Sequence, residues 1–286
     1  MKTGFAARRA MLRAWAAHDA AAFRAFTAAI ESRVGRPFQE LRVLDLGCGP
    51  NAPMTVLLHA AGSQVTGVDV SIEHRWGLGF RPSRYVEYAG RAGVLRSVRK
   101  LAGELAFDRL YFRHLAHLTG LALSDKGLDL QAMDIQRPTL APATFDVVHS
   151  NATWEHLEDV ALANRTLASV LRPGGVGYIE IHLFPSLSGG HDLPWIVPGV
   201  TMLNGHEPWR HLRDPVWNPP VFLNRLREQD YRTLFERTEG LEIEDWSVEF
   251  TEGSELVTAA LLNELTDYSI RELTTRSIVA VVRRPD

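Results

Sequence analysis

The feature that most constrains this chain is a short apolar segment, Arg42-Val-Leu-Asp-Leu-Gly-Cys48, that runs directly into a turn and a helical pattern. Apolar residues that end in glycine are typical of a buried strand. Gly47 and Gly49 let the backbone turn sharply and approach a ligand without a collision at Cβ. Asp45 places a carboxylate inside the same turn, so the segment predicts a ligand site at the carboxyl end of a strand.

Two further acids follow apolar segments. Asp69 comes 20 residues after Gly49, and a carboxylate at that separation can accept hydrogen bonds from both hydroxyls of a ribose. Asp134 ends the third apolar segment and can accept from an adenine amino group, with Ile135 flanking the base. Together these acids predict a nucleoside-binding site.

Apolar segments and helical patterns alternate along the chain. Strands are predicted at residues 42–48, 64–70, 128–134, 145–151, 175–183, 241–250 and 277–282. Helices are predicted at 5–33, in two pieces with Asp19 capping the second, and at 52–61, 155–171, 221–237 and from 254. The near-continuous apolar character of the strands favours an α/β fold with a doubly wound, mostly parallel seven-stranded sheet covered on both faces.

The predicted domain organisation is one domain over residues 1–286. It comprises an N-terminal helical element at 1–36, a helical lid insertion at 73–123 and a substrate-side loop insertion at 184–220. Both insertions are too long for simple connections, and both leave from the carboxyl ends of strands, where ligands bind in open parallel sheets. The segment from Pro198 to Pro220 fits either a cover over the site or a homodimer contact.

The sequence resembles the class I S-adenosylmethionine-dependent methyltransferases. The resemblance rests on the following segments in family order: Asp45-Leu-Gly-Cys-Gly49, Thr66-Gly-Val-Asp-Val-Ser71, Asp134, Phe145-Asp-Val-Val-His-Ser-Asn151 with Glu155-His-Leu157, and Leu171-Arg-Pro-Gly-Gly175. It implies the seven-stranded fold and S-adenosylmethionine as cofactor. The cofactor-binding residues that it implies are Asp45, Gly47, Gly49, Asp69, Val70, Asp134, Ile135 and Asn151. Asn51 stands where many members have a third glycine, and asparagine tolerates left-handed dihedral angles well.

A dinucleotide oxidoreductase is the rival interpretation. Residues 47–52 also satisfy the G-x-G-x-x-A pattern, and Asp69 would serve NAD equally. However, Asp45 would repel a pyrophosphate, whereas it suits a sulfonium cofactor with a primary ammonium group. A module that binds the cofactor without catalysis also stays open.

Polar residues near the strand ends are the candidates for the acceptor side. We predict catalytic roles for His149, His182 and His191, although His149 also fits a packed core histidine. Substrate-binding roles are predicted for Trp154, His156, Asp192, Arg75, Tyr85 and Tyr111. Glu155 and His156 are expected to begin a helix, where a glutamate suits the positive end of the dipole. Imidazoles with Asp192 would suit a divalent metal ion, but no tight ligand spacing supports one, so no metal ligands are assigned.

The expected reaction is methylation of an oxygen on a small polar or anionic biosynthetic intermediate. Such a transfer needs the acceptor atom, the methyl group and the sulfur in line, and a hydroxyl acceptor also needs a base. Methylation of a nitrogen is one alternative. Another is a cyclisation of the cofactor that releases methylthioadenosine.

Charge and composition limit the partners. The chain has 31 basic and 34 acidic residues, and residues 75–117 carry nine Lys or Arg against three Asp or Glu. This local basic region suits a small anionic substrate, whereas nucleic acid needs a broad basic track and is not expected. A single cysteine, no signal peptide and no run of 18 apolar residues predict a cytoplasmic protein that does not enter the membrane.

Overall fold

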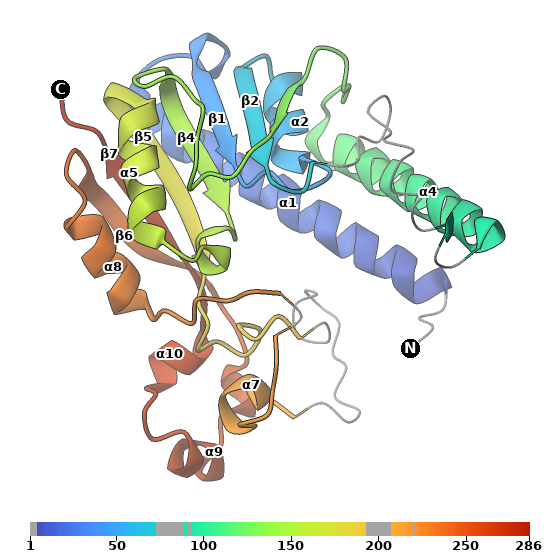
Figure 1. Ribbon diagram of the computed structural model, residues 1–286, viewed down its shortest axis with the longest axis vertical. Helices are drawn as coiled ribbons and strands as arrows, with labels where there is room; N and C mark the ends of the chain where they lie inside the picture. The colour runs from blue at the N-terminus through green and yellow to red at the C-terminus, as the bar shows by residue number, and fades with distance from the viewer. Residues whose placement is uncertain (1–4, 73–88, 91–92, 193–206, 220) are drawn as a thin grey trace. The chain divides into compact units, whose positions relative to one another are not determined.

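The computed structural model describes residues 5–72, 89–90, 93–192, 207–219 and 221–286 (Figure 1). Its strands are β1 (Arg42–Leu46), β2 (Gln64–Asp69), β3 (Asp129–Ala132), β4 (Phe145–Asn151), β5 (Leu171–His182), β6 (Glu242–Thr251) and β7 (Thr275–Arg283). They form a seven-stranded sheet of order β3-β2-β1-β4-β5-β7-β6. The pairs β1–β4, β2–β3 and β4–β5 are parallel, and β7 is antiparallel to β5 and β6. The predicted α/β fold with a mostly parallel seven-stranded sheet is confirmed.

The α-helices are α1 (Phe5–Val34), α2 (Pro53–Ala60), α4 (Val94–Thr119), α5 (Val160–Val170), α7 (Arg210–Arg213), α8 (Glu228–Glu236), α9 (Ala259–Glu264) and α10 (Ile270–Thr274). Short 3-10 turns occur at η1 (Phe38–Glu40), η2 (Trp154–His156) and η3 (Ser254–Leu256). Across the described part of the chain, none of these helices combines the length and the apolar character that crossing a bilayer requires.

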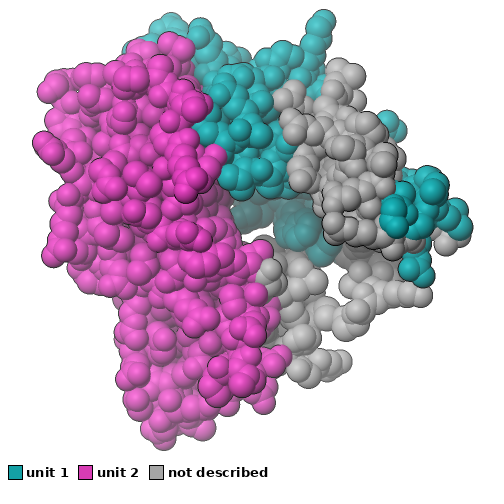
Figure 2. All heavy atoms as spheres, in the orientation of Figure 1, with its two compact units in different colours: residues 1–41, 48–133 teal, residues 42–47, 134–286 magenta. Residues whose placement is uncertain are grey.

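The chain divides into two compact units (Figure 2). Unit 1 comprises Met1–Leu41 and Cys48–Met133, and unit 2 comprises Arg42–Gly47 and Asp134–Asp286. The assignment of all 286 residues to one domain stays a prediction. In the insertion predicted at 73–123, α4 occupies Val94–Thr119, and residues 73–88 and 91–92 lie outside the described residues.

Unit 1 contains the long helix pair α1 and α4 (Figure 1). The two helices bury an apolar seam against α2, with Leu12, Ala16, Ala20, Val56, Leu57, Phe112 and Leu115 in it. The prediction that α1 breaks into two pieces is wrong, because its many alanines favour helix through the expected break. Asp19 caps no helix. It lies in the middle of α1, where its carboxylate accepts a hydrogen bond from the Tyr111 hydroxyl.

Unit 2 contains the connection that positions the site. The predicted helix from Glu155 is wrong at its start, because α5 begins at Val160, where the Asp159 side chain accepts a hydrogen bond of 2.8 Å from the Leu162 N–H. Glu155 instead lies in η2, directly after β4. The helix predicted from residue 221 also begins later, at Glu228. The preceding segment is held to η2 by Asn224, whose side-chain amide donates to the carbonyl groups of Trp154 (2.7 Å) and Leu157 (3.1 Å).

Candidate functional site

In unit 1, the predicted cofactor residues around Asp69 form a compact hydrogen-bonded turn. One Asp69 carboxylate oxygen accepts the Gly49 N–H at 2.9 Å, and the other accepts the N–H and the hydroxyl of Ser71 at 2.6 and 2.5 Å. Gly49 has φ +72°, and a Cβ there would meet no described atom within 4 Å. This turn therefore leaves open space beside an acidic side chain. Val70 is exposed, and the Asn51 side chain donates to Asp108.

In unit 2, Asp45 and His149 form a buried pair. An Asp45 oxygen lies 2.8 Å from the His149 Nδ1, and the two residues are 1% and 3% exposed. The His149 ring also stacks on Tyr178, with ring centroids 6.4 Å apart. Gly47 has φ +72°, and a Cβ there would lie 2.0 Å from the Thr153 hydroxyl oxygen. The structure thus gives His149 a fixed partner, and its catalytic role stays a prediction.

The other predicted cofactor residues of unit 2 follow strand ends. An Asp134 oxygen accepts the Gln136 N–H at 2.9 Å. The Ile135 carbonyl accepts the Thr166 hydroxyl at 3.0 Å, and the Ile135 side chain is buried. Asn151 is the half-buried last residue of β4. None of these contacts tests cofactor binding, so the roles stay predictions.

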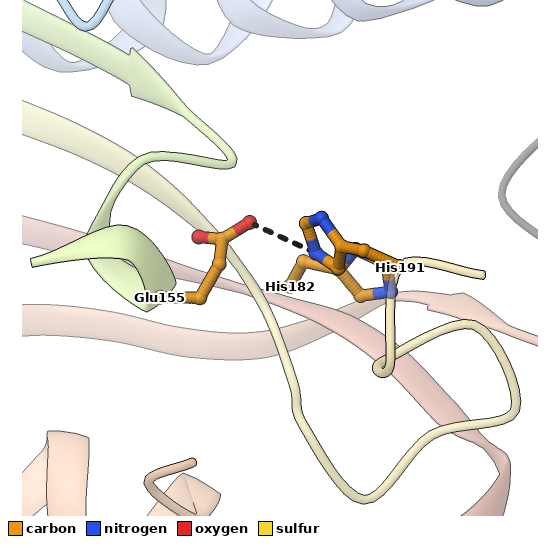
Figure 3. A group of neighbouring side chains, drawn as sticks. All are labelled: Glu155, His182 and His191. Carbon is orange, nitrogen blue, oxygen red and sulfur yellow. Dashed lines mark ion pairs between the residues drawn. The ribbon is translucent and has the colours of Figure 1, made fainter. Parts of the chain in front are cut away.

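Three polar side chains of unit 2 converge at the carboxyl ends of β4 and β5 (Figure 3). Each of Glu155, His182 and His191 offers a ligand atom, and these atoms all lie within 4.8 Å of one another. Glu155 belongs to η2, His182 ends β5, and His191 follows a tight turn after β5. We call these three residues the Glu155 cluster. Two of its members were predicted as catalytic, and the structure brings them together.

Glu155 is the least compensated charged group of the cluster. It is 2% exposed, and neither of its carboxyl oxygens has a hydrogen-bond partner among the residues described. Burial raises its pKa to about 8 and the charge of Glu180 acts in the same direction, whereas the backbone N–H groups of Glu155 and His182 act in the opposite one. The carboxyl group is therefore mostly protonated at neutral pH unless a ligand supplies positive charge.

His191 faces Glu155 across 4.0 Å, measured from Nε2 to the nearer carboxyl oxygen. This Nε2 is buried and has no hydrogen-bond partner within the described ranges. Burial lowers the His191 pKa to about 4, with additional repulsion from His156 and Arg276. The imidazole is therefore neutral near pH 7 and does not neutralise the carboxylate.

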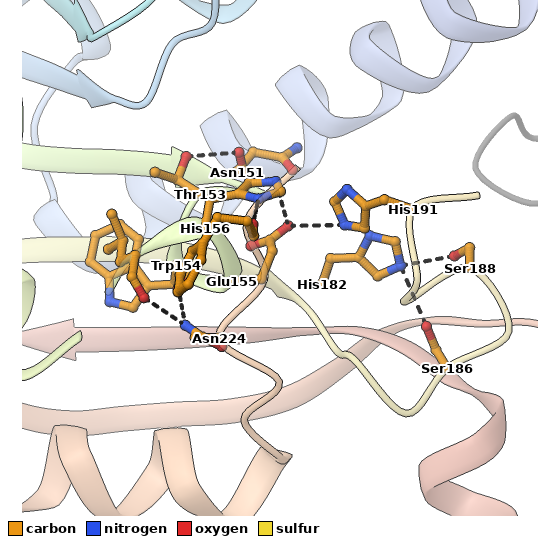
Figure 4. A network of polar contacts seen from close by, with 12 residues as sticks. Asn151, Thr153, Trp154, Glu155, His156, His182, Ser186, Ser188, His191 and Asn224 are labelled. Atoms are coloured by element: carbon orange, nitrogen blue, oxygen red, sulfur yellow. Dashed lines mark hydrogen bonds and ion pairs between the residues drawn. The ribbon is translucent and has the colours of Figure 1, made fainter. Parts of the chain in front are cut away.

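The His182 ring is oriented by hydrogen bonds to residues outside the Glu155 cluster (Figure 4). Its Nε2 lies 2.8 Å from the Ser188 hydroxyl, and that hydroxyl lies 2.6 Å from a Glu252 oxygen. Because a carboxylate only accepts, Ser188 donates to Glu252 and accepts from the imidazole. The network thus assigns the proton of His182 to Nε2 and leaves a lone pair on Nδ1. Burial lowers the His182 pKa well below its usual value, so this imidazole is also neutral.

Aromatic contacts pack the histidines against one another. The rings of His182 and His191 stack with centroids 4.9 Å apart, and the ring of His156 meets His191 edge to face at 4.8 Å. The His156 Nδ1 lies 2.8 Å from the Phe222 carbonyl oxygen. The Glu155 carbonyl accepts the Asn224 N–H at 2.9 Å, so the segment before α8 also fixes the turn that carries the carboxyl group.

The turn between His182 and His191 can pack this closely because it contains two glycines. A Cβ on Gly189 would lie 2.2 Å from the Phe184 carbonyl oxygen, and one on Gly190 would lie 2.6 Å from the His211 side chain. His191 itself adopts φ +56°, a left-handed conformation that costs a non-glycine residue energy. The fold therefore holds the imidazole at a strained position.

The remaining predicted substrate residues are dispersed. Trp154 is fully buried, and its indole N–H donates to Asn164 at 2.8 Å. Tyr111 packs between α1 and α4 in unit 1. Asp192 follows His191 directly and is half-buried. Arg75 and Tyr85 lie outside the described residues, and none of these substrate roles is tested.

Three contributors to the site were missed by sequence reasoning. These are Ser188, Asn224 and Glu252, which were given no role, whereas Glu155 was a candidate at a strand end with a helix start as the alternative. The spacing Ser186-Leu-Ser-Gly-Gly-His191 was the available signal, because two hydroxyls, two glycines and a histidine follow a strand end. Asn224 and Glu252 lie 69 and 97 residues after Glu155 in the sequence, and only the fold brings them near it.

Comparison with known proteins identifies similar chains. A family profile described as a methyltransferase domain matches residues 12–245. An uncharacterized methyltransferase of Mycobacterium tuberculosis is 35% identical over 97 residues, which cover 33% of this chain and 48% of that protein. A ubiquinone biosynthesis O-methyltransferase of Parvibaculum lavamentivorans is 24% identical over 181 residues, which cover 60% of this chain and 54% of that protein. The chain thus spans about half the length of the curated relatives it matches.

Among solved structures, an S-adenosylmethionine dependent methyltransferase from Mesorhizobium loti is 17% identical. The alignment covers 87% of this chain and 94% of that chain, with a TM-score of 0.46.

Proposed function

Since the chain belongs to the methyltransferase domain family, we propose that it transfers a methyl group from S-adenosylmethionine to an oxygen atom of a small polar or anionic metabolite. The observation that carries the choice of oxygen is the Glu155 cluster. It places a buried carboxyl group 4.0 Å from a buried imidazole nitrogen of His191, and neither group has a hydrogen-bond partner among the described residues. The His156 Nε2 lies at the same distance, 4.0 Å, from the Glu155 carboxyl group. An acceptor hydroxyl can lie about 2.8 Å from both the carboxyl oxygen and the His191 nitrogen at once.

The residues around Asp69 and Asp45 fit the cofactor that this reaction requires. In unit 1, the open space at Gly49 beside the Asp69 carboxylate suits a ribose that donates two hydroxyl groups. In unit 2, Asp45 suits an ammonium group, and Asp134 and Ile135 suit an adenine. The cofactor supplies an electrophilic methyl group when it is bound.

The protein's own contribution is to hold the acceptor and take its proton. A hydroxyl becomes a better nucleophile when a nearby base accepts its proton during the transfer. Glu155 is the acidic side chain of the Glu155 cluster, and its pKa is about 8 in the chain without ligand. The positive charge of the bound cofactor would favour its carboxylate form, which can accept the proton. His191 is neutral and can hydrogen-bond the acceptor without competing for the negative charge. Burial of the cluster keeps water from the reacting atoms.

Product analysis tests this proposal. The full chain is incubated with S-adenosylmethionine that carries a labelled methyl group and with a deproteinised metabolite extract. We expect S-adenosylhomocysteine, together with a labelled product in which the methyl group is bound to oxygen. Label on nitrogen would reject the choice of oxygen, and methylthioadenosine in place of S-adenosylhomocysteine would reject methyl transfer.

A further inference from the structure

We propose that Glu155, His182 and His191 bind a divalent first-row transition-metal ion, with zinc as the ion that best fits the donor set. Two imidazole nitrogens and one carboxylate are the ligands of many catalytic zinc sites, which keep further positions open for water or substrate. The three residues come from η2, the end of β5 and the turn that follows it. All of them lie within unit 2.

The Glu155 cluster contains buried polar atoms that have no hydrogen-bond partner among the described residues. A buried carboxyl group with no partner is costly, and so is a buried imidazole nitrogen with none. Both occur here in the described structure, 4.0 Å apart and facing each other. One cation between them would satisfy the Glu155 carboxylate and the His191 Nε2 together.

The hydrogen bonds of His182 leave one of its ring nitrogens in a position to bind a metal ion. A metal ligand must be a neutral imidazole with a free lone pair. The hydrogen bonds through Ser188 to Glu252 hold the proton of His182 on Nε2, which leaves Nδ1 available. Metal-bound histidines usually donate their other ring N–H to such a partner, which fixes the ring. Arg276, 3.7 Å from Glu252, provides this carboxylate with a counter-charge.

The distances between the ligand atoms of the Glu155 cluster are close to those of a zinc site. Donor atoms about 2.1 Å from a tetrahedral zinc ion lie about 3.4 Å from one another. The ligand atoms of the cluster lie within 4.8 Å of one another, so a contraction of up to about 1.4 Å would bring them to that distance. Mg²⁺ is a poor fit, because it prefers oxygen ligands in octahedral geometry. No metal ligands were assigned from the sequence, where Asp192 was considered beside the histidines, whereas in the structure Glu155 lies with His182 and His191.

The inference deepens the proposed function and rests on it only for the purpose of the ion. A bound cation would hold the acceptor oxygen and favour loss of its proton, as metal ions do for bound water. Without an ion, Glu155 would accept the proton directly, and the proposed methyl transfer would be unaffected. Binding and activity are therefore measured separately.

The test is calorimetric titration of the chelator-treated, dialysed full chain with Zn²⁺ and, separately, with Mg²⁺. We expect one Zn²⁺ per chain with a dissociation constant in the micromolar range or below, and no comparable heat with Mg²⁺. Glu155→Gln and His191→Ala should each weaken Zn²⁺ binding at least tenfold. His59→Gln, which changes a histidine of unit 1, is the matched control and should leave binding unchanged.

Circular dichroism of each variant shows whether it has folded. If a variant fails to fold, native mass spectrometry of the wild-type chain gives the Zn²⁺ stoichiometry without it. Absence of a stoichiometric Zn²⁺ ion on the wild-type chain overturns the inference, as does equally tight binding by folded Glu155→Gln. Formation of S-adenosylhomocysteine by a chain that binds no ion would reject the metal site while leaving the proposed function in place.

Discussion

The burial of Glu155 makes a quantitative prediction about stability. Replacement of Glu155 by Gln removes an ionisable group and keeps nearly the same shape. The folded chain holds a proton on Glu155 up to about pH 8, whereas the ordinary pKa of a glutamate is 4.5. Between these values the unfolded chain has released a proton that the folded chain keeps. The free energy of unfolding must therefore fall as the pH rises through this interval.

The size of the change in the free energy of unfolding follows from the difference between the two Glu155 pKa values, 4.5 and about 8. Each unit of pKa difference corresponds to about 1.4 kcal/mol, so the whole interval amounts to roughly 5 kcal/mol. Buried histidines act in the opposite direction at lower pH. Burial lowers the pKa values of His191 and His211 from 6.5 to about 4. Between these values the unfolded chain binds more protons than the folded chain, so the contribution of these histidines to the free energy of unfolding increases as the pH rises toward 6.5. Between pH 6.5 and 8 these histidines no longer contribute a pH dependence, and the effect of Glu155 on the free energy of unfolding amounts to about 2 kcal/mol.

The assay is urea unfolding of the chelator-treated chain, followed by circular dichroism at several pH values between 5 and 8. The stability of the wild type relative to Glu155→Gln should fall by about 2 kcal/mol between pH 6.5 and 8. Glu158→Gln is the matched control, because this glutamate is exposed three residues later and should show no such trend. A difference between wild type and Glu155→Gln that stays constant across pH would refute the argument that Glu155 is buried without compensation.

Three further substitutions test other parts of the structure. Asp69→Ala should weaken S-adenosylmethionine binding by about 1 to 3 kcal/mol in a calorimetric titration, and unchanged affinity would reject Asp69 as a cofactor ligand. Gly47→Ala should lower the free energy of unfolding by about 2 kcal/mol or more, because its Cβ would collide with Thr153 and the backbone has positive φ. Urea unfolding measures this loss, and a variant as stable as the wild type would contradict the collision. Tyr111→Phe should cost about 1 to 2 kcal/mol in the same assay, because Asp19 loses its hydrogen bond inside the helix pair. No loss would mean that water replaces the hydroxyl.

The strands could be predicted from sequence because their signals are local. Apolar segments of the sequence identified all seven strands, and β4 matches its predicted bounds, Phe145–Asn151. The errors concern the boundaries of helices. The expected break in α1 is spanned by a continuous helix that packs on α4, and residues 155–159 are excluded from α5 by the cap at Asp159.

The candidate site could be predicted only in part. His182 and His191 were found because they lie at and just after a strand end, where ligands bind in this class of sheet. The burial of Glu155 could not be read from its neighbours in the sequence. It depends on Asn224, which ties η2 to the segment before α8. The orientation of His182 likewise depends on Glu252, 70 residues further along the chain.

The central claim is that the Glu155 cluster receives the acceptor in a methyl transfer. It is tested most directly by comparing wild type, Glu155→Gln and Glu158→Gln for labelled methyl transfer to the acceptor found in the extract, at saturating S-adenosylmethionine. The account predicts that Glu158→Gln matches the wild type. Glu155→Gln should bind the cofactor normally and lose about 100-fold or more of the turnover rate. Equal turnover by Glu155→Gln and the wild type would contradict the claim.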